Sequence, residues 1–318
     1  FAQPGPLLLV ESLIHWKSAM YFFPDTRTDI SPTASVGLHD GGFQVWETLL
    51  EQGSGPVNED VLATAGPLSI VCDGATSLHG ATRRQPDAGS AWGGQKAAMI
   101  TASAFSAAPE RGLLDSVRRA NELIREAMID HGIDLRDREQ LWSTSFAAVQ
   151  TEGEAIHWCQ TGDCMILLIY EDGRVCQLTH PPGQDREVLK RWQQIGARSD
   201  TAIHQALAGE IAAVRRRMNR DFGVLNGEAE ALDFISSGTI EEDRITDIVL
   251  FSDGLFPPSS CPDELFDAPL FVQLYRNGGL DAIRRHVRAL QSTDPGCYRY
   301  PRFKIFDDIS GIALKKRS

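Results

Sequence analysis

The stretch Leu-Ser-Ile-Val-Cys-Asp-Gly at residues 68–74 places a carboxylate and a glycine directly after a short apolar run. A run of this length that is rich in Ile and Val predicts a buried strand. The charge of Asp73 stands at the rim of that strand, where burial is costly unless a cation or a hydrogen-bond donor meets it. We therefore expect Asp73 to have a charged or polar partner supplied by another part of the chain.

The same pattern returns far downstream. Residues 248–254 read Ile-Val-Leu-Phe-Ser-Asp-Gly, and the acidic pair Asp307-Asp308 stands directly before the strand-like residues 309–314. Three aspartates at strand edges that are widely separated in sequence predict a cation site that forms only when the sheets pack.

The ligand types favour a hard cation. Asp73, Asp253 and Asp307 all offer oxygen, with no His or Cys at ligand spacing, and all-oxygen coordination suits Mg²⁺ or Mn²⁺ rather than zinc. Gly74 and Gly254 let the backbone approach an ion, and the Gly74 carbonyl could itself be a ligand. Two adjacent ions could activate a bridging water and clamp a phosphoryl group. The alternative is that each Asp-Gly pair is only a turn, since spacing alone does not show convergence.

The composition is that of an ordinary globular protein of 318 residues, with a formal net charge of -12. The acidic balance argues against nucleic acid as a partner. No apolar run approaches the ~20 residues of a membrane span. The six cysteines show no CxxC spacing, so we expect buried free thiols and a reducing, cytoplasmic location.

The pattern of elements predicts an α+β protein, because strand meanders alternate with groups of helices rather than forming a parallel βαβ array. Hairpin-type turns are predicted at Glu152-Gly153, Gly162-Asp163 and Asp172-Gly173. Residues 43–50 are ambiguous between strand and helix. Helices are expected at 95–107, 113–132, 185–195, 201–217 and 280–290, and strands at 68–73, 144–150, 154–160, 164–171, 174–178, 231–235, 247–251 and 303–314.

A basic run, Arg215-Arg216-Arg217 with Arg220, ends one predicted helix. Two interpretations stay open. The run is either a solvated helix end or a contact for a phosphorylated substrate.

Six short motifs occur in an order that resembles the metal-dependent, type 2C Ser/Thr protein phosphatases, over residues 50–314. They are Asn58-Glu59-Asp60, Val71-Cys72-Asp73-Gly74, Ser143-Thr144-Ser145, Thr161-Gly162-Asp163, Phe251-Ser252-Asp253-Gly254-Leu255 and Asp307-Asp308-Ile309-Ser310. The resemblance implies a four-layer αββα sandwich of two mostly antiparallel sheets flanked by helices. It further implies an N-terminal extension over residues 1–45 and a phosphatase-like domain over 46–318, with a helical insertion at about 184–220.

The resemblance also implies a centre of two Mn²⁺ or Mg²⁺ ions, with a third, weaker ion. Asp73 would bridge both ions, the Gly74 carbonyl would bind one, and Asp253 and Asp307 would hold the other. Glu59 and Asp60 would ligate directly or orient bound water, and Asp163 would serve the third ion. Asp60, Asp73 and Asp253 are the residues expected to carry catalysis.

Several positions depart from the family pattern. Ala75 and Thr76 replace the usual His-Gly, so the expected leaving-group acid is absent, and His79 is an alternative for it or simply a loop residue. Gly55 replaces an Arg that grips the phosphate, a role open to Arg83 or Arg84. Pro257 replaces an acidic residue, so Asp163 could be only a turn residue. None of these changes removes a core ligand, whereas a missing acid typically costs ~10²–10⁴-fold in rate.

The leading hypothesis is a metal-dependent phosphomonoesterase that hydrolyses phosphoserine and phosphothreonine in proteins by attack of a metal-bridging hydroxide. Its partner would be a phosphorylated protein, such as the target of a cognate Ser/Thr kinase. Two alternatives remain: a pseudophosphatase that serves as a binding or regulatory module, and a hydrolase of small phosphate esters.

Overall fold

The computed structural model describes residues 42–76, 92–153, 155–195, 201–241, 244–264 and 266–317. All of them fall in one compact unit of the chain, His39–Ser318. The proposed alternatives His79, Arg83 and Arg84 lie outside the described residues, as does nearly all of the predicted extension over 1–45. The domain boundaries therefore stay a prediction.

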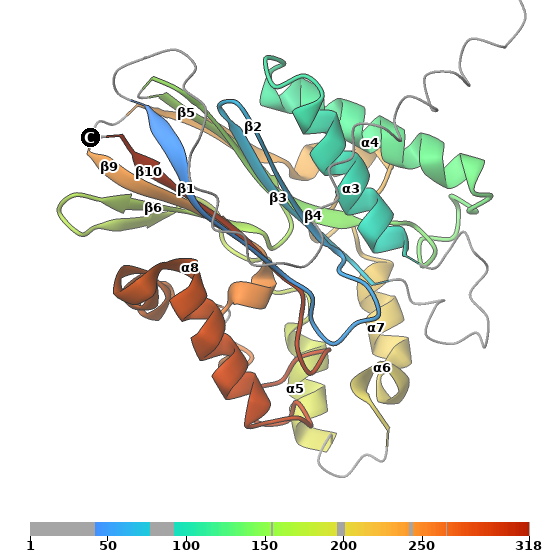
Figure 1. Cartoon of the computed structure of the whole chain (residues 1–318). Helices are drawn as coiled ribbons and strands as arrows, with labels where there is room; N and C mark the ends of the chain where they lie inside the picture. The colour runs from blue at the N-terminus through green and yellow to red at the C-terminus, as the bar shows by residue number, and fades with distance from the viewer. Residues whose placement is uncertain are drawn as a thin grey trace, which may run out of the picture. The chain divides into compact units, whose positions relative to one another are not determined.

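Two five-stranded sheets form the centre of the unit, and every pairing between their strands is antiparallel (Figure 1). Sheet A has the order β1 (Phe43–Glu51), β10 (Ile309–Lys316), β9 (Ile245–Phe251), β6 (Met165–Tyr170) and β7 (Val175–Gln177). Sheet B has the order β2 (Asp60–Ala65), β3 (Leu68–Gly74), β4 (Thr144–Glu152), β5 (Ala155–Thr161) and β8 (Ser236–Glu241). The ambiguous segment at 43–50 is thus a strand.

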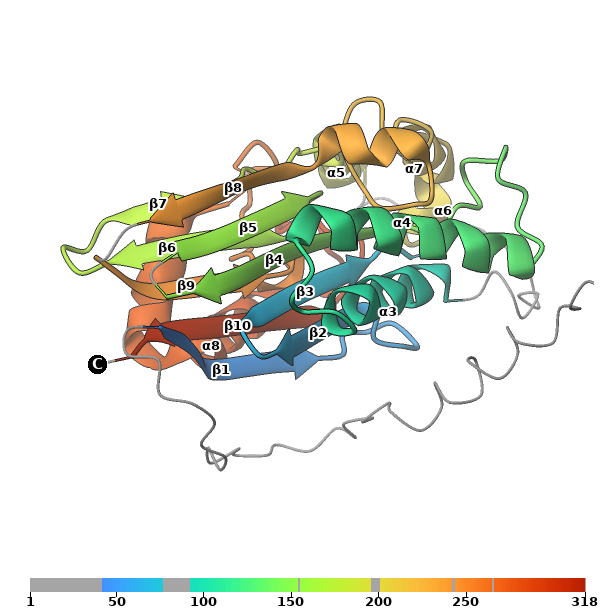
Figure 2. The same ribbon diagram turned by 90° about the horizontal axis from the view of Figure 1, so that it is seen from above.

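In the central strands β3, β4, β6 and β9, side chains on both faces of the sheets are buried. Val71 and Ala147 of sheet B pack with Ile248 and Ile312 of sheet A between the two sheets. On the outer face of sheet B, α3 (Gly93–Ser106) and α4 (Leu113–Asp130) run side by side (Figure 2). On the outer face of sheet A lies α8 (Ala268–Ser292). The expected αββα sandwich is confirmed.

A group of shorter helices gathers at one end of the sheets (Figure 1). It comprises α5 (Arg186–Ile195), α6 (Ile203–Ala206) and α7 (Ala208–Arg215), which share an apolar cluster of their own. The Trp192 ring lies 5.5 Å from that of Tyr298, so this helical lobe packs against the loop that leads into β10. The lobe covers the region predicted as an insertion.

Two local predictions were wrong, and two had wrong bounds: the strand predicted over 303–314 begins at Ile309, and the helix predicted over 201–217 is divided into α6 and α7. The turn Gly162-Asp163 is not a hairpin, because β5 belongs to sheet B and β6 to sheet A, so the chain crosses between the sheets there. The stretch predicted as a strand at 231–235 falls in a 3₁₀ helix, Ala229–Phe234, and the strand follows it as β8. All six cysteines are free, as expected.

Candidate metal centre

The register of sheet B brings two acidic residues together at one end. Asp60, the first residue of β2, lies directly opposite Asp73 near the end of β3. Asp73 in turn lies opposite Ser145 near the start of β4. Opposed positions of an antiparallel pair hold their side chains on the same face of the sheet, about 5 Å apart. The two carboxylates are therefore neighbours in space although they belong to different strands.

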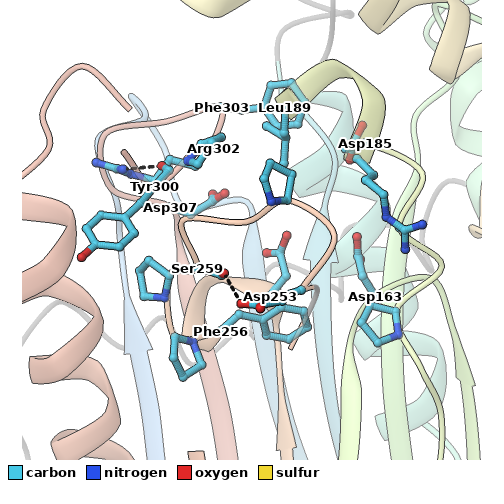
Figure 3. Close-up of a pocket in the computed structure, with 18 of the residues that line it drawn as sticks. Asp163, Asp185, Leu189, Asp253, Phe256, Ser259, Tyr300, Arg302, Phe303 and Asp307 are labelled. Carbon is cyan, nitrogen blue, oxygen red and sulfur yellow. Dashed lines mark hydrogen bonds between the residues drawn. The ribbon is translucent and has the colours of Figure 1, made fainter. Parts of the chain in front are cut away.

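Sheet A supplies acidic residues to the same end of the sandwich. Phe251, the last residue of β9, lies opposite Met165 at the start of β6 and Gly311 near the start of β10. The residues just beyond these strand ends are Asp253, Asp163 and Asp307. Figure 3 shows the side chains of all three around one cavity. The convergence that the sequence could not show is present in the structure.

Hydrogen bonds from neighbouring segments fix the side chains of Asp60 and Asp308. The buried hydroxyl of Ser252 donates to Asp60 Oδ2 at 2.6 Å and accepts from the Ser310 backbone N–H at 2.9 Å. Asp308 accepts from the backbone N–H groups of Gly53 at 2.7 Å and Glu59 at 3.0 Å. Asp308 therefore fixes the loop before β2, whereas its neighbour Asp307 lines the cavities.

Gly74 allows the end of β3 to approach α3. A Cβ at this position would overlap the backbone of Gly94 and would lie 2.8 Å from the Glu59 carbonyl oxygen. The Gly74 N–H donates to that same carbonyl at 3.1 Å. The absence of a side chain at Gly74 is thus required for the segments carrying Glu59 and Asp73 to lie together.

The carboxylates repel one another electrostatically. Burial raises the pKa of Asp73 well above its usual range, and the charges of Asp60 and Asp253 raise it further. Burial, together with Asp163 and Asp307, does the same for the pKa of Asp253. The pKa of Asp60 is also raised, chiefly by burial. Each group favours the neutral form unless a cation compensates the shared negative charge.

Lys304 supplies part of that compensation. Its Nζ lies 2.9 Å from Asp307 Oδ1 and 3.6 Å from carboxylate oxygens of Glu59 and Asp308. Burial opposes the ammonium charge, but the three carboxylates outweigh it and raise the pKa of Lys304. One internal cation thus faces a larger number of acidic groups.

Glu59 and Asp163 also have donors within the protein. The Thr76 hydroxyl donates to Glu59 Oε2. Ser145 Oγ donates to Asp163 Oδ1 at 2.6 Å, and Gln184 Nε2 donates to Asp163 Oδ2 at 2.9 Å. Both oxygens of Asp163 are therefore engaged, which fits an orienting role at the crossing turn as well as the proposed ligand role.

The donor set fits a divalent cation chemically. Carboxylate oxygens from both sheets share one end of the sandwich, their pKa values are raised by burial and by one another's charge, and Gly74 keeps a backbone segment close. Among the described residues, no three His, Cys, Asp or Glu side chains are already arranged as ligands of a single ion. The ligand roles of Asp73, Gly74, Asp253, Asp307, Glu59 and Asp163 are accordingly a proposal.

Two cavities meet at these carboxylates. The first, of about 200 Å³, lies between Phe256, Pro257 and Leu189. The second, of about 160 Å³, extends under the helical lobe to Thr76 and Arg215. Both are lined by Asp163, Gln184, Asp185, Asp253, Phe303 and Asp307. A molecule bound in either cavity would touch the acidic cluster.

Comparison with known proteins identifies the family. The sequence profile described as Protein phosphatase 2C matches residues 52–285, which is most of the chain. The chain belongs to the protein phosphatase 2C family. A search of curated proteins gives no significant match.

Solved phosphatase 2C structures share the fold at low sequence identity. The catalytic domain of the serine/threonine protein phosphatase PstP, in complex with two manganese ions, is 16% identical, with a TM-score of 0.52 over 87% of this chain and 99% of that one. PppA, a T6SS regulatory component of Pseudomonas aeruginosa, is 14% identical, with a TM-score of 0.51 over 86% and 98%. A bacterial serine phosphatase that bears a point mutation is 11% identical, with a TM-score of 0.51 over 86% and 97%.

Three residues of the candidate site are not singled out by sequence patterns alone. Ser252 belongs to the motif around Asp253, and its place directly before that aspartate marks it as a candidate. Lys304 carries no local pattern that points to Glu59, which lies at the other end of the domain sequence. Arg215 is one member of a basic run.

None of the helices in the described part of the chain combines the length and the apolar character of a membrane span.

Proposed function

We propose that this phosphatase 2C domain is a metal-dependent phosphomonoesterase that hydrolyses phosphoserine and phosphothreonine in proteins. The observation that supports this most strongly is the convergence of Asp60 and Asp73 from sheet B with Asp253 and Asp307 from sheet A. Family membership gives the reaction class, since the family consists typically of metal-dependent Ser/Thr phosphatases.

Each residue would have a defined part in the reaction. Asp73 lies centrally among the acidic groups, with Asp60 and Asp253 as charged neighbours, so it is the candidate to bridge two Mg²⁺ or Mn²⁺ ions. Asp253 and Asp307 would hold one ion from the side of sheet A. Asp60, fixed by Ser252, would position water. When bound, the ions would supply Lewis-acid activation of water and neutralise the phosphoryl charge.

The leaving group has no histidine next to Gly74. Ala75 and Thr76 line the second cavity there, and the Thr76 hydroxyl is already donated to Glu59. Esters with a good leaving group depend least on a general acid. We therefore expect an aryl phosphate to be hydrolysed more readily than an alkyl phosphate of similar size.

The decisive experiment is hydrolysis of an aryl phosphate with Mn²⁺ by wild type, Asp253→Asn and Asp263→Asn. Asp263 is a matched control because it lies on the surface and pairs with Lys190 at 2.8 Å. We expect Asp253→Asn to lose at least roughly 100-fold in kcat/KM, since a metal ligand is removed, while Asp263→Asn stays at the wild-type value. Activity on phosphopeptides but not on small metabolites would separate a protein phosphatase from a hydrolase of small esters.

A second candidate, a pseudophosphatase used as a binding module, is favoured by one observation. Lys304 already places a cation 2.9 Å from Asp307 and 3.6 Å from Glu59. Such an ammonium could satisfy the carboxylates without a metal. Calorimetry with Mn²⁺ separates the candidates. A binding module would bind Mn²⁺ weakly, or would bind it without turning over substrate. In such a module, Lys304→Met would strengthen Mn²⁺ binding.

A further inference from the structure

We propose that Arg215 recognises the phosphoryl group of the substrate, entering the centre from the helical lobe. The inference rests on the proposed function, since it assigns the anion-binding residue of the same site. Arg215 is the last residue of α7 and lines the second cavity together with Asp73, Thr76, Asp253 and Lys304.

The arginines of the basic run at the end of α7 lie in different environments. Arg216 pairs with Glu139, and Arg217 pairs with Asp221 at 3.2 Å, and both arginines are about half exposed. Arg215 turns inwards instead. Its Nη1 donates to Ser143 Oγ at 3.3 Å and its Nη2 donates to the Thr76 carbonyl. Of the two interpretations of the run, a solvated helix end holds for Arg216 and Arg217 and not for Arg215.

The positive charge of Arg215 is available to a bound ligand. Among the described residues, no carboxylate oxygen lies within the 4.0 Å of an ion pair with its guanidinium, and burial lowers its pKa. A guanidinium has five N–H donors, and these two contacts use two of them. Arg215 is half-buried, and the carboxylates whose charge acts on it, Asp185 and Glu59, lie beyond ion-pair distance, so an incoming dianion would be bound favourably.

The other cations of this cavity are less suited to that task. Lys304 is committed to Asp307, Glu59 and Asp308. Burial and the nearby charge of Lys304 lower the pKa of His204, which favours the uncharged imidazole. Arg215 is thus the lining cation whose charge is not directly paired within the described part of the chain.

The contacts of Arg215 also place it correctly for a phosphoryl group. Thr76 follows Gly74 by two residues, and the Ala75 N–H donates to the Ser143 carbonyl at 3.0 Å. The guanidinium therefore braces the segments that leave β3 and enter β4, and it lines the same cavity as Asp73. A guanidinium is planar and can bind a phosphoryl group through two N–H donors, and Arg215 presents it from the end of α7.

The test measures binding of inorganic phosphate to the Mg²⁺-supplemented full chain by calorimetry, for wild type, Arg215→Ala, Arg215→Lys and Arg217→Ala. We expect Arg215→Ala to weaken phosphate binding by about 10- to 100-fold, as loss of a charge-assisted contact does. Arg215→Lys should be intermediate because it keeps the charge but not the fork. Arg217→Ala should bind as wild type does. Thermal unfolding of each variant checks that it is folded.

Kinetics with an aryl phosphate gives a second readout: Arg215→Ala should raise KM in parallel with the phosphate Kd and change kcat less. Equal phosphate affinities for folded Arg215→Ala or Arg215→Lys and for Arg217→Ala would overturn the inference, as would a wild type that binds no phosphate. Phosphate binding lost in Arg215→Ala without any wild-type turnover would support the role of Arg215 and reject the proposed function. If wild type turned over the substrate and Arg215→Ala left that turnover unchanged, the proposed function would stand and the role of Arg215 would be rejected.

Discussion

Asp60 and Asp73 lie directly opposite one another in the antiparallel register of β2 and β3. Like charges at opposed positions destabilise a sheet, and burial raises the pKa of both groups. Ser252 gives Asp60 one hydrogen bond, which does not remove the charge. The folded chain therefore holds an electrostatic cost at this end of sheet B, and a divalent cation is the partner of the right charge to relieve it.

Metal binding should accordingly stabilise the fold. At a free Mn²⁺ concentration 100 times the Kd, the expected gain is about 2.7 kcal/mol, or a rise of roughly 5–10 °C in the unfolding midpoint. Asp253→Asn should lose most of the rise, and Asp263→Asn should keep it. Differential scanning calorimetry with and without Mn²⁺ measures both. Equal midpoints in the two conditions for the wild type would contradict the proposed centre.

In the presence of a metal chelator, the unfolding free energy of the protein should depend on pH through the ionisation of Asp185. Burial, aided by the charge of Asp163, raises the pKa of Asp185 from 3.8 to about 7. The folded state then binds more protons than the unfolded state between these values. The contribution of Asp185 to stability is therefore present below pH 4 and lost as the pH rises through 7, with a slope of at most about 1.4 kcal/mol per pH unit.

Asp185→Asn isolates this effect, because Asp60, Asp73 and Asp253 titrate in the same direction in both proteins. The difference in unfolding free energy, wild type minus variant, should fall steadily from pH 4 to pH 7 in EDTA. Urea unfolding at a series of pH values measures it. Parallel curves would show that Asp185 ionises in the folded chain as it does in the unfolded one.

Ser252→Ala should destabilise the protein by roughly 1–3 kcal/mol, because it leaves the buried Asp60 carboxylate and the Ser310 N–H without their shared partner. Loss of the hydroxyl should also raise the pKa of Asp60 further and weaken Mn²⁺ binding. Ser259→Ala is the control, since the Ser259 hydroxyl also bridges a carboxylate, Glu264, and a backbone N–H, that of Cys261, but at a more exposed site. Denaturant unfolding of both variants decides the matter, and equal stabilities would refute the bracing role of Ser252.

Gly74→Ala should destabilise the protein by about 1–3 kcal/mol or more, because the new methyl group would overlap backbone rather than a movable side chain. Gly209→Ala is the matched control. Gly209 lies in α7, a Cβ there would meet nothing within 4 Å, and Ala should stabilise the helix by about 0.5–1 kcal/mol. Thermal unfolding should show a lower midpoint for Gly74→Ala and a higher midpoint for Gly209→Ala than for the wild type. A Gly74→Ala variant as stable as the wild type would mean that β3 and α3 can separate.

The central strands and the long helices were predictable because their apolar residues follow a clear period, as at 144–150 and 113–132. β8 was not predictable: Ser236-Ser237-Gly238 is exposed and is held by backbone pairing with β5, which leaves no pattern in the side chains. The turn at Gly162-Asp163 has the composition of a hairpin, yet the next strand pairs in the other sheet. Local sequence encodes the turn but not the sheet to which the chain continues.

The candidate site was predicted in part for a similar reason. Acidic residues at strand ends can be read locally, so Asp73, Asp253 and Asp307 were found from the sequence. The partners that compensate or orient them lie far away in sequence: Lys304 reaches Glu59, and Arg215 reaches Thr76. Such contacts depend on how the lobe and the loop before β10 pack, which periodicity does not describe.

The different surroundings of Asp307 and Asp308 have a consequence for how the chain can vary in length. One carboxylate lines the cavities, and its immediate neighbour accepts the N–H groups of Gly53 and Glu59. Inserting one residue between Asp308 and Ile309 would move Asp308 to the place of Asp307 at the cavities and would leave Gly53 and Glu59 without their acceptor, even though both aspartates remained. The distance in sequence from this pair to β10 therefore matters as much as the identity of its residues.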